Sequence, residues 1–424
     1  MKKIFFTLII TVSGVINYAQ QIISPESQKA ITEKLASEIT KYYFDKNVAK
    51  SISDSLIIIK TQLKNRITTD NFIEIVNTAL HKISNDNHLK LHLDIDMFKS
   101  YSDDANEIIK FEYERAKKIN FGFTKVNVLD GNIGYIEIIN FSRFVGEEVA
   151  QKIASAMNIL ESTNALIIDL RENMGGDGRV GEILETYFYP EENEIYYDSV
   201  SKTEKFRVLP FVSGKRYLNR PVYILTGLGT FSAAEGFANS MQKNKKAIIV
   251  GEKTKGGGNS GSSVPILDGF LCFIPTSLGV SDEEASVKPD FITSYKSALN
   301  YAKYFIYKEE LNKSCNDKDK EIIEWNIKTS EYSLHLNDKY FTFNNNFIGN
   351  YESGRIILLK DGQPFLNFKN KDYKLAQINE NEFIIEDNES TFGLGNNRLI
   401  FNENGFDNLI YFSGQLMKKY FKKN

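Results

Sequence analysis

The sequence predicts an α/β protein with a mostly parallel, buried central sheet, a helical region before it and an antiparallel β domain after it. Between residues 120 and 292, apolar runs of strand length alternate with helical patterns, which is typical of parallel strands connected by helices. Residues 24–83 carry apolar side chains at helical spacing. From Tyr332 onward, short apolar and aromatic runs alternate with Asn, Asp and Gly turns, and this pattern predicts antiparallel strands.

In the central region, strands and helices are expected where the period of the apolar pattern changes. The predicted strands are 133–139, 165–170, 222–225 and 247–250. The predicted helices are 146–161, 180–187 and 232–242. Strands that alternate with helices in this way predict a mostly parallel, buried sheet.

The flanking elements have their own start signals. Ser24, Pro25 and Glu26 combine a capping residue, a first-turn proline and an early acid, so a helix is expected to begin there. A second helix is expected to begin near Asp70. Residues 89–95 alternate apolar and polar side chains and predict a strand, and 295–313 predicts a further helix.

The chain has 424 residues, which is too long for one compact core. Changes in pattern predict an export signal, three folded parts and a linker. These are a signal peptide at 1–19, a helical subdomain at 20–115, a catalytic-type domain at 116–295, a helical linker at 296–330 and a small β domain at 331–424.

The N-terminus has the order of a secretory signal. Lys2 and Lys3 precede an apolar stretch at 4–15, and Ala19 offers a small residue for cleavage before Gln20. We therefore expect export to the periplasm, the cell surface or the medium after cleavage. The alternative is a buried N-terminal helix.

Composition excludes several kinds of partner. The net charge of -3 gives no electrostatic basis for binding nucleic acid or an anionic membrane, and no later apolar run predicts a membrane span. No metal or other cofactor is expected, and the sequence carries no signal for an oligomeric state. Cys272 lies in an apolar run and is expected to be buried, while its pairing with Cys315 stays open.

Two segments directly after predicted strands could carry chemistry. The first, DLRENMGG at 169–176, ends in Gly175 and Gly176, whose N–H groups can face a developing negative charge. The second, TFSAAEG at 230–236, places Ser232 at the start of a helix, with the Ala233 N–H beside it. Ser232 is either a nucleophile or an ordinary helix cap.

A serine nucleophile needs a base, and His88 in SNDNHL at 84–89 is the candidate. A surface or structural histidine is the simpler interpretation of such a residue. A metal site is a further alternative because His81 and His92 are close in sequence, but no second ligand cluster accompanies them.

Together these segments resemble the C-terminal-processing, or tail-specific, serine peptidases of family S41. The resemblance covers residues 120–292 well and 24–95 loosely. The matching segments are 169–176, 221–235, GEKTKGGG at 251–258 and VKPD at 287–290, in the family's order and spacing. The resemblance implies a crotonase-like core and a peptide or protein substrate.

The family has two catalytic arrangements, and the resemblance favours one of them here. The Ser-Lys dyad would place its lysine where this chain has Gly257. The branch similar to tricorn and to interphotoreceptor retinoid-binding protein uses a serine, an N-terminal histidine and a glutamate. That arrangement implies Ser232, His88 and Glu283 as catalytic residues, with Glu284 one position off.

The resulting hypothesis is a secreted serine endopeptidase with an oxyanion hole made from the N–H groups of Gly175 or Gly176 and of Ala233. The alternative is a binding protein for an apolar ligand or peptide on the same fold. In a weaker third interpretation, the C-terminal β domain attaches the protein to a surface or a partner.

Overall fold

The computed structural model describes residues 22–101, 105–190, 194–198, 203–207, 212–313, 317–336, 341–386, 397–410 and 415–423. The predicted signal peptide and Cys315 lie outside the described residues. The chain divides into two compact units: residues up to Phe111 with the inserted segment Gly257–Asp282, and Glu112–Gly256 with Glu283–Asn424. The predicted domain boundaries run linearly along the chain, whereas the structure groups the segment Gly257–Asp282 with the N-terminal unit.

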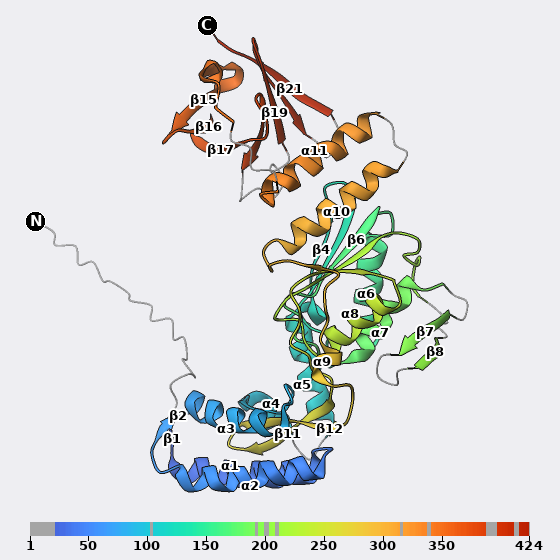
Figure 1. Cartoon of the computed structure of the whole chain (residues 1–424), viewed down its shortest axis with the longest axis vertical. Coiled ribbons are helices and arrows are strands. Elements are labelled where there is room, and N and C mark those ends of the chain that lie inside the picture. The colour runs from blue at the N-terminus through green and yellow to red at the C-terminus, as the bar shows by residue number, and fades with distance from the viewer. Residues whose placement is uncertain are drawn as a thin grey trace, which may run out of the picture. The chain divides into compact units, whose positions relative to one another are not determined.

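The second unit is built around a six-stranded sheet, and the predicted fold class is confirmed (Figure 1). The strands are β4 (Phe123–Leu129), β5 (Ile133–Ile138), β6 (Ala165–Asp169), β9 (Val222–Thr226), β10 (Ile248–Gly251) and β13 (Phe291–Ile292). Their order is β13-β10-β9-β6-β5-β4, and only β4 is antiparallel to its neighbour. The four strands predicted in this region are therefore confirmed, within one or two residues at each end.

Helices cover both faces of this sheet because its central strands are apolar on both sides. The helices are α6 (Glu147–Ile159), α7 (Gly178–Glu185), α8 (Ala233–Lys243) and α10 (Ala298–Asn312). Val222 and Ile224 of β9 belong to the core that includes α6, α7 and α8. The alternate residues Tyr223 and Leu225 pack with α10 instead. One face of β9 is therefore covered by α6, α7 and α8, and the opposite face is covered by α10.

The first unit consists of helices packed on a small antiparallel sheet. Its helices are α1 (Pro25–Tyr42), α2 (Lys46–Gln62), α3 (Thr69–Ser84) and α4 (Ile95–Ser100), and α5 (Ala105–Lys118) leads into the second unit. Its strands are β1 (Ile22–Ile23), β2 (Ile67–Thr68), β3 (Lys90–Leu93), β11 (Ser260–Leu267) and β12 (Phe270–Ser277). Ser24 caps α1 as predicted, by accepting a hydrogen bond from the Ser27 N–H.

The sheet of the first unit joins residues that are far apart in the sequence. β12 pairs with β3 in the register Cys272↔Leu91, and β11 pairs with β12. This pairing explains why the segment Gly257–Asp282 belongs to the N-terminal unit. The Cys272 side chain is fully buried, as predicted, and burial raises the pKa of its thiol.

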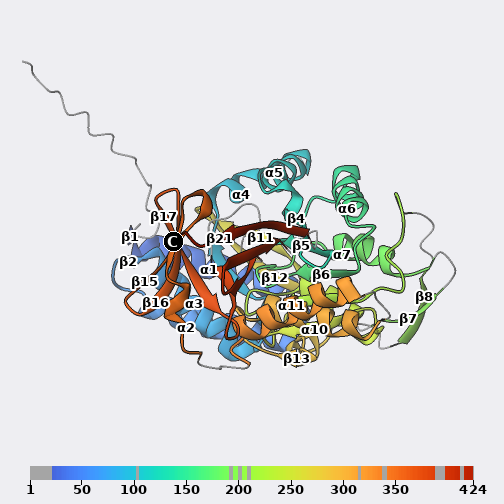
Figure 2. The same ribbon diagram turned by 90° about the horizontal axis from the view of Figure 1, so that it is seen from above.

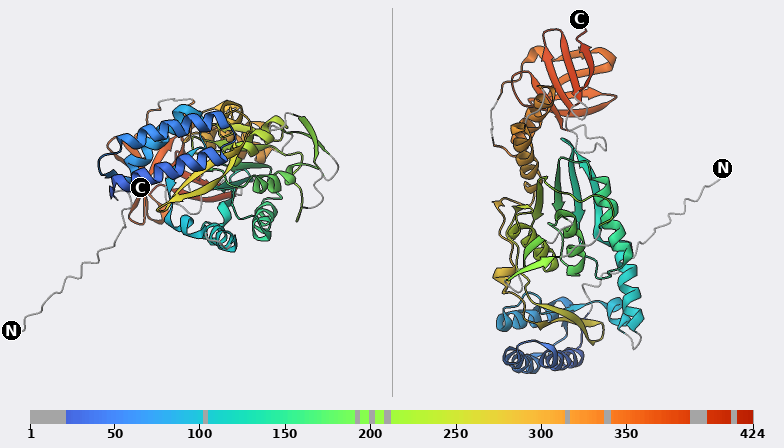
Figure 3. Two further views of the ribbon diagram at one scale, coloured as in Figure 1. Left: turned by 90° about the horizontal axis from the view of Figure 1, so that it is seen from below. Right: turned by 90° about the vertical axis from the view of Figure 1, so that its right-hand side faces the viewer.

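The C-terminal residues form an eight-stranded antiparallel meander that curves into a near-barrel (Figure 3). Its strands are β14 (Gly349–Tyr351), β15 (Arg355–Lys360), β16 (Gln363–Phe368), β17 (Lys371–Gln377), β18 (Glu382–Glu386), β19 (Asn397–Asn402), β20 (Gly405–Ile410) and β21 (Gln415–Phe421). A bridge between Tyr351 and Lys422 brings the first strand to the end of the last, so both edges of the sheet are covered there. Aromatic residues fill the interior: Phe347 stacks on Phe401 with ring centroids 4.5 Å apart.

A helix pair connects the six-stranded sheet to this barrel. α11 (Asp317–Ser333) runs beside α10, as two views agree (Figures 1 and 2). Trp325 of α11 is buried with Ala376 and Ile384 on the barrel wall. Two further strands, β7 (Glu194–Asp198) and β8 (Thr203–Arg207), form a separate hairpin. Among the described residues, no helix has both the length and the apolar character needed to span a membrane.

Candidate active site

Ser232 lies between β9 and α8, at the carboxyl end of the parallel sheet. It is the N-cap residue of α8, as the simpler interpretation of the sequence expected. Its backbone, however, has φ 55° and ψ −121°, whereas helix caps ordinarily have extended backbone at negative φ. A non-glycine residue in this region costs about 1–3 kcal/mol and is found mainly at functional turns. This strained strand-to-helix turn is the geometry of a nucleophile elbow.

The buried carboxylate of Glu235 holds the Ser232 turn in place. Glu235 Oε2 accepts the Ser232 N–H at 2.7 Å. Its Oε1 accepts the Thr254 hydroxyl at 2.5 Å and the Gly256 N–H at 2.7 Å. The side chain is fully buried, so these charge-assisted hydrogen bonds compensate its loss of hydration. The sequence interpretation missed Glu235, although a serine followed three residues later by glutamate is the capping-box pattern.

Gly175 brings the glycine turn directly against Ser232. A Cβ atom on Gly175 would lie 2.7 Å from the Phe231 carbonyl oxygen and 2.8 Å from Ser232 Cβ. Its φ of 90° is also a conformation that residues with side chains rarely adopt. The position therefore requires glycine, for both space and backbone conformation.

The N–H groups around Ser232 differ in what they bind. The Gly175 N–H donates to Asn173 Oδ1 at 2.9 Å, so it holds the turn together. The described residues offer no acceptor to the N–H of Gly176 or of Ala233. Phe141 and Gly176 form a parallel bridge, in which the Phe141 N–H donates to the Gly175 carbonyl and the Asp177 N–H donates to the Phe141 carbonyl. The Gly176 N–H therefore points away from Phe141. Two donors thus remain beside the serine.

An ion pair at the end of β6 anchors the start of the glycine turn. Both carboxylate oxygens of Asp169 bind the Arg171 guanidinium, and Oδ2 also accepts the Tyr135 hydroxyl at 2.7 Å. Arg171 continues to the Tyr295 carbonyl at 2.6 Å and stacks on the Tyr295 ring. Burial, together with the Asp169 carboxylate, raises the pKa of Tyr135 and keeps it a donor.

His88 lies in the first unit, in the loop between α3 and β3. It is 8% exposed, and its ring packs against Phe273 with centroids 5.2 Å apart. It is therefore a buried histidine rather than a surface one. Within the described residues, no group of three or more His, Cys, Asp or Glu side chains is arranged to hold a metal ion.

Glu283 lies on the short helix α9 (Asp282–Ala285) and is exposed. Its oxygens form ion pairs with Lys253 at 2.9 Å and Lys288 at 3.0 Å. Hydrogen bonds from these two lysines lower the pKa of Glu283, so it is ionised at neutral pH. The structure thus brings together Ser232, Ala233 and the two glycines, whereas Glu283 contacts lysines.

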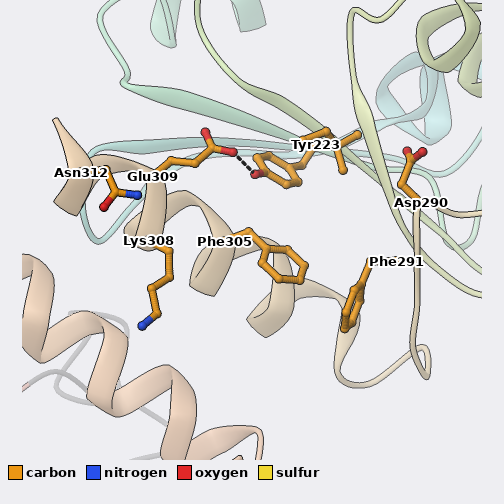
Figure 4. A pocket seen from close by; sticks show the side chains of 8 residues that line it. Tyr223, Asp290, Phe291, Phe305, Lys308, Glu309 and Asn312 are labelled. Carbon is orange, nitrogen blue, oxygen red and sulfur yellow. Dashed lines mark hydrogen bonds between the residues drawn. The ribbon is translucent and has the colours of Figure 1, made fainter.

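A separate hollow of about 360 Å³ lies on the α10 side of the sheet (Figure 4). Phe291, Phe305 and Ile248 line it together with polar residues that include Asp290 and Lys308. A hydrogen bond of 2.8 Å joins the Tyr223 hydroxyl to Glu309 beside it. Because Tyr223 faces α10, this hollow is on the opposite side of β9 from the core beneath Ser232.

A strained serine at a helix start, packed against a glycine turn with two available N–H groups, is typical of hydrolases with a serine nucleophile. Comparison with known families agrees with this class. Residues 132–291 match the model of Peptidase family S41. The central region of the chain is therefore similar to peptidase family S41.

Curated relatives match the same part of the chain. The carboxyl-terminal-processing protease of Synechocystis sp. (strain ATCC 27184 / PCC 6803 / Kazusa) is 34% identical over 140 residues, which are 32% of this chain and 31% of that protein. Carboxy-terminal processing protease CtpB of Bacillus subtilis (strain 168) is 24% identical over 225 residues, covering 50% of this chain and 44% of the relative. The matches thus span less than half of each relative.

Solved structures show a weaker, partial likeness. The photosystem II D1 C-terminal processing protease is 13% identical, with a TM-score of 0.36 over 63% of this chain and 93% of that one. The tricorn protease is 15% identical, with a TM-score of 0.40 over 68% of this chain and 37% of that one.

Proposed function

We propose that this protein is an exported serine endopeptidase that hydrolyses peptide bonds in peptide or protein substrates. Ser232 is the nucleophile, His88 the general base and Glu283 the assisting carboxylate. The N–H groups of Gly176 and Ala233 form the oxyanion hole, and Gly175 fixes its shape. The strained backbone of Ser232, seated on a glycine turn with two available donors, is the observation that supports this proposal most strongly.

The reaction follows from these roles. Ser232 Oγ attacks the carbonyl carbon of the scissile bond while His88 takes its proton. The carbonyl oxygen becomes an oxyanion and accepts hydrogen bonds from Gly176 and Ala233, each of which contributes about 3–4 kcal/mol of barrier lowering in such sites. His88 then gives the proton to the leaving amine, which departs and leaves an acyl group on Ser232. Water, deprotonated by His88, releases the acid and restores the serine.

The test is cleavage of unfolded casein by the chain from Gln20 onward, compared with its Ser232→Ala variant, each with and without a metal chelator. We expect activity in the parent chain, none in the variant, and no effect of the chelator. Equal activity in both proteins would exclude Ser232 as the nucleophile. His88→Ala and Glu283→Gln then test the other two roles in the same assay.

Binding of an apolar ligand without cleavage is the second candidate function. The apolar hollow lined by Phe291 and Phe305 favours it, because its volume is in the range of small-molecule sites. The discriminating variant is Phe305→Ala, which leaves the Ser232 turn unchanged. If the hollow is the functional site, this variant loses ligand binding while Ser232→Ala retains it.

A further inference from the structure

Three consecutive backbone N–H groups lead into His88, and each binds a side-chain oxygen. The Asp86 N–H donates to Ser84 Oγ at 3.2 Å. The Asn87 N–H donates to Asp282 Oδ2 at 3.0 Å, and the His88 N–H to Asp86 Oδ1 at 2.8 Å. The loop thus depends on specific side chains for its backbone hydrogen bonds.

Asp86 is the centre of this arrangement, and it is only 2% exposed. Besides the His88 N–H, its carboxylate accepts the Tyr43 hydroxyl at 3.2 Å and the Asn259 Nδ2 at 2.9 Å, both on Oδ2. Three donors thus converge on this buried carboxylate. It therefore ties the His88 loop to the end of α1 and to the start of β11.

The partners of Asp86 are themselves fixed. Asn259 uses its Oδ1 to accept the Gly279 N–H at 3.1 Å. Asp282 uses its second oxygen to accept the Gly258 N–H at 3.2 Å. Burial, with the Asp86 carboxylate next, raises the pKa of Tyr43, so its hydroxyl remains a donor across the neutral range. All of these groups lie within the first unit.

We propose that Asp86 is a positioning residue that fixes His88 for catalysis through its hydrogen bonds to the His88 N–H, Tyr43 and Asn259. This inference rests on the proposed function, in which His88 is the base. Misplacing a catalytic group by about 1 Å can cost about 100-fold in rate, because proton transfer needs aligned donor and acceptor. Asp86 is buried and acts through His88, so its effect is expected on turnover rather than on substrate binding.

The first variant is Asp86→Asn, which keeps the size of the side chain. An amide can still accept the His88 N–H, but its NH2 group then faces two donors, from Tyr43 and Asn259. We expect kcat for a casein-derived peptide to fall about 10- to 100-fold, with KM changed less than about twofold. Thermal melting of each variant shows whether the fold is retained.

The decisive variant exchanges the two partners. In the double variant Asp86→Asn with Asn259→Asp, the side chain at position 86 becomes the donor and the side chain at position 259 becomes the acceptor. The hydrogen bond between the two positions is therefore restored with its direction reversed. We expect the double variant to recover most of the lost kcat, while Asn259→Asp alone, which sets two carboxylates against each other, loses activity. Such non-additivity is the signature of a direct interaction.

Asp94→Asn is the matched control. Asp94 is a carboxylate of the same unit that accepts a backbone N–H, that of Met97 at 2.9 Å, but it is no part of the Asp86 network. We expect it to keep kcat within about twofold, because an Asn side chain can accept the same backbone N–H and caps a helix about as well as Asp does.

The outcomes separate the inference from the function on which it rests. If Ser232→Ala is as active as the parent chain, the serine mechanism fails, and the role of Asp86 fails with it. If Ser232→Ala is inactive but Asp86→Asn turns over like the parent chain, only the inference on Asp86 is overturned. An equal loss in Asp94→Asn, or no recovery in the exchanged pair, also overturns it.

Discussion

At the scale of single residues, the conformation of Ser232 distinguishes a nucleophile from a helix cap. The sequence alone left both interpretations open, because Ser is common at helix starts. The structure assigns the residue to the cap position and adds a positive φ that capping does not require. The strain must be compensated by surrounding contacts, chiefly those of Glu235, which reaches the segment around Thr254 and Gly256.

This strain predicts an unusual effect of substitution on stability. Alanine at position 232 suffers the same backbone strain as serine, whereas glycine tolerates φ 55°. We expect Ser232→Gly to be more stable than Ser232→Ala by about 1 kcal/mol, after the greater freedom of glycine in the unfolded chain is subtracted. Urea unfolding of the two inactive variants measures the difference. A less stable glycine variant would show that Ser232 is unstrained.

At position 175, we predict that even the smallest side chain, that of alanine, reduces activity. The methyl group of Gly175→Ala would overlap Phe231 and Ser232, so we expect casein cleavage to fall by about 100-fold or more. The matched control is Gly178→Ala in the first turn of α7, where an added Cβ meets nothing within 4 Å. Equal activity of the two variants would contradict the role given to Gly175.

At the scale of elements, the attachment of the C-terminal barrel depends on one buried cation. Arg398 of β19 binds Glu382 of β18 and, at 3.0 Å, Glu321 of α11. Its guanidinium also stacks over the Trp325 ring, 5.0 Å from the centroid. The side chains of Arg398 and Glu382 are only 11% and 8% exposed, so their charges are largely shielded from water.

Removing this cation should therefore be costly. Arg398→Ala leaves Glu382 buried without its main counter-charge, and we expect the barrel to lose about 3–5 kcal/mol of unfolding free energy. Chemical denaturation, monitored by the fluorescence of Trp325, measures this loss of unfolding free energy. Lys360→Ala is the control, because its ion pair with Asp372 is accessible to solvent and contributes little to stability. Similar losses in both variants would count against a special role for Arg398.

The elements themselves were largely predictable, because period and turn residues are local signals. The strands at 165–170 and 222–225 and the helix from Ser24 follow from them directly. The pairing of β12 with β3 was not predictable, since nothing local connects Leu91 with Cys272. The same holds for Glu235, whose capping pattern gives no sign of its contacts 19 and 21 residues away.

At the scale of the whole molecule, many tyrosines are buried with their hydroxyl groups hydrogen-bonded. Burial raises the pKa of Tyr43, Tyr135, Tyr223 and Tyr307, and that of Tyr351 to about 12. Neighbouring carboxylates add to the effect at four of them: Asp86 beside Tyr43, Asp169 beside Tyr135, Glu309 beside Tyr223 and Asp130 beside Tyr307. Each of these phenols stays neutral in the folded protein at a pH where it ionises in the unfolded chain.

These shifts predict how stability depends on alkaline pH. An unfolded tyrosine loses its proton near pH 10, whereas the buried groups keep theirs, so the unfolded state binds fewer protons above that pH. The buried tyrosines therefore contribute fully to the free energy of unfolding below about pH 10. This contribution is lost as the pH rises toward about 12 and beyond. Urea midpoints across this range should fall steeply, and tyrosinate absorbance should appear together with unfolding. Tyrosinate formation in the folded protein near pH 10 would contradict this burial.

The candidate site could be predicted only in part. Ser232, the glycine turn and His88 were predicted from their joint resemblance to the motifs of one peptidase family, because the local pattern alone also allowed a helix cap and a structural histidine. The contacts of Glu283 with two lysines, and the binding of the Gly175 N–H by Asn173, depend on side-chain positions that no local pattern encodes. Asp86 stands two residues before His88 in the sequence, but two of its partners, Tyr43 and Asn259, lie 43 and 173 residues away.

The central claim is that Ser232 is an activated nucleophile, and covalent labelling tests it most directly. The chain from Gln20 onward is treated with a fluorophosphonate, and the modified peptide is located by mass spectrometry. We predict a single adduct on Ser232, absent from Ser232→Ala and formed much more slowly in His88→Ala. An unlabelled Ser232 in a chain that cleaves casein, or labelling that is equal in His88→Ala, would contradict the account.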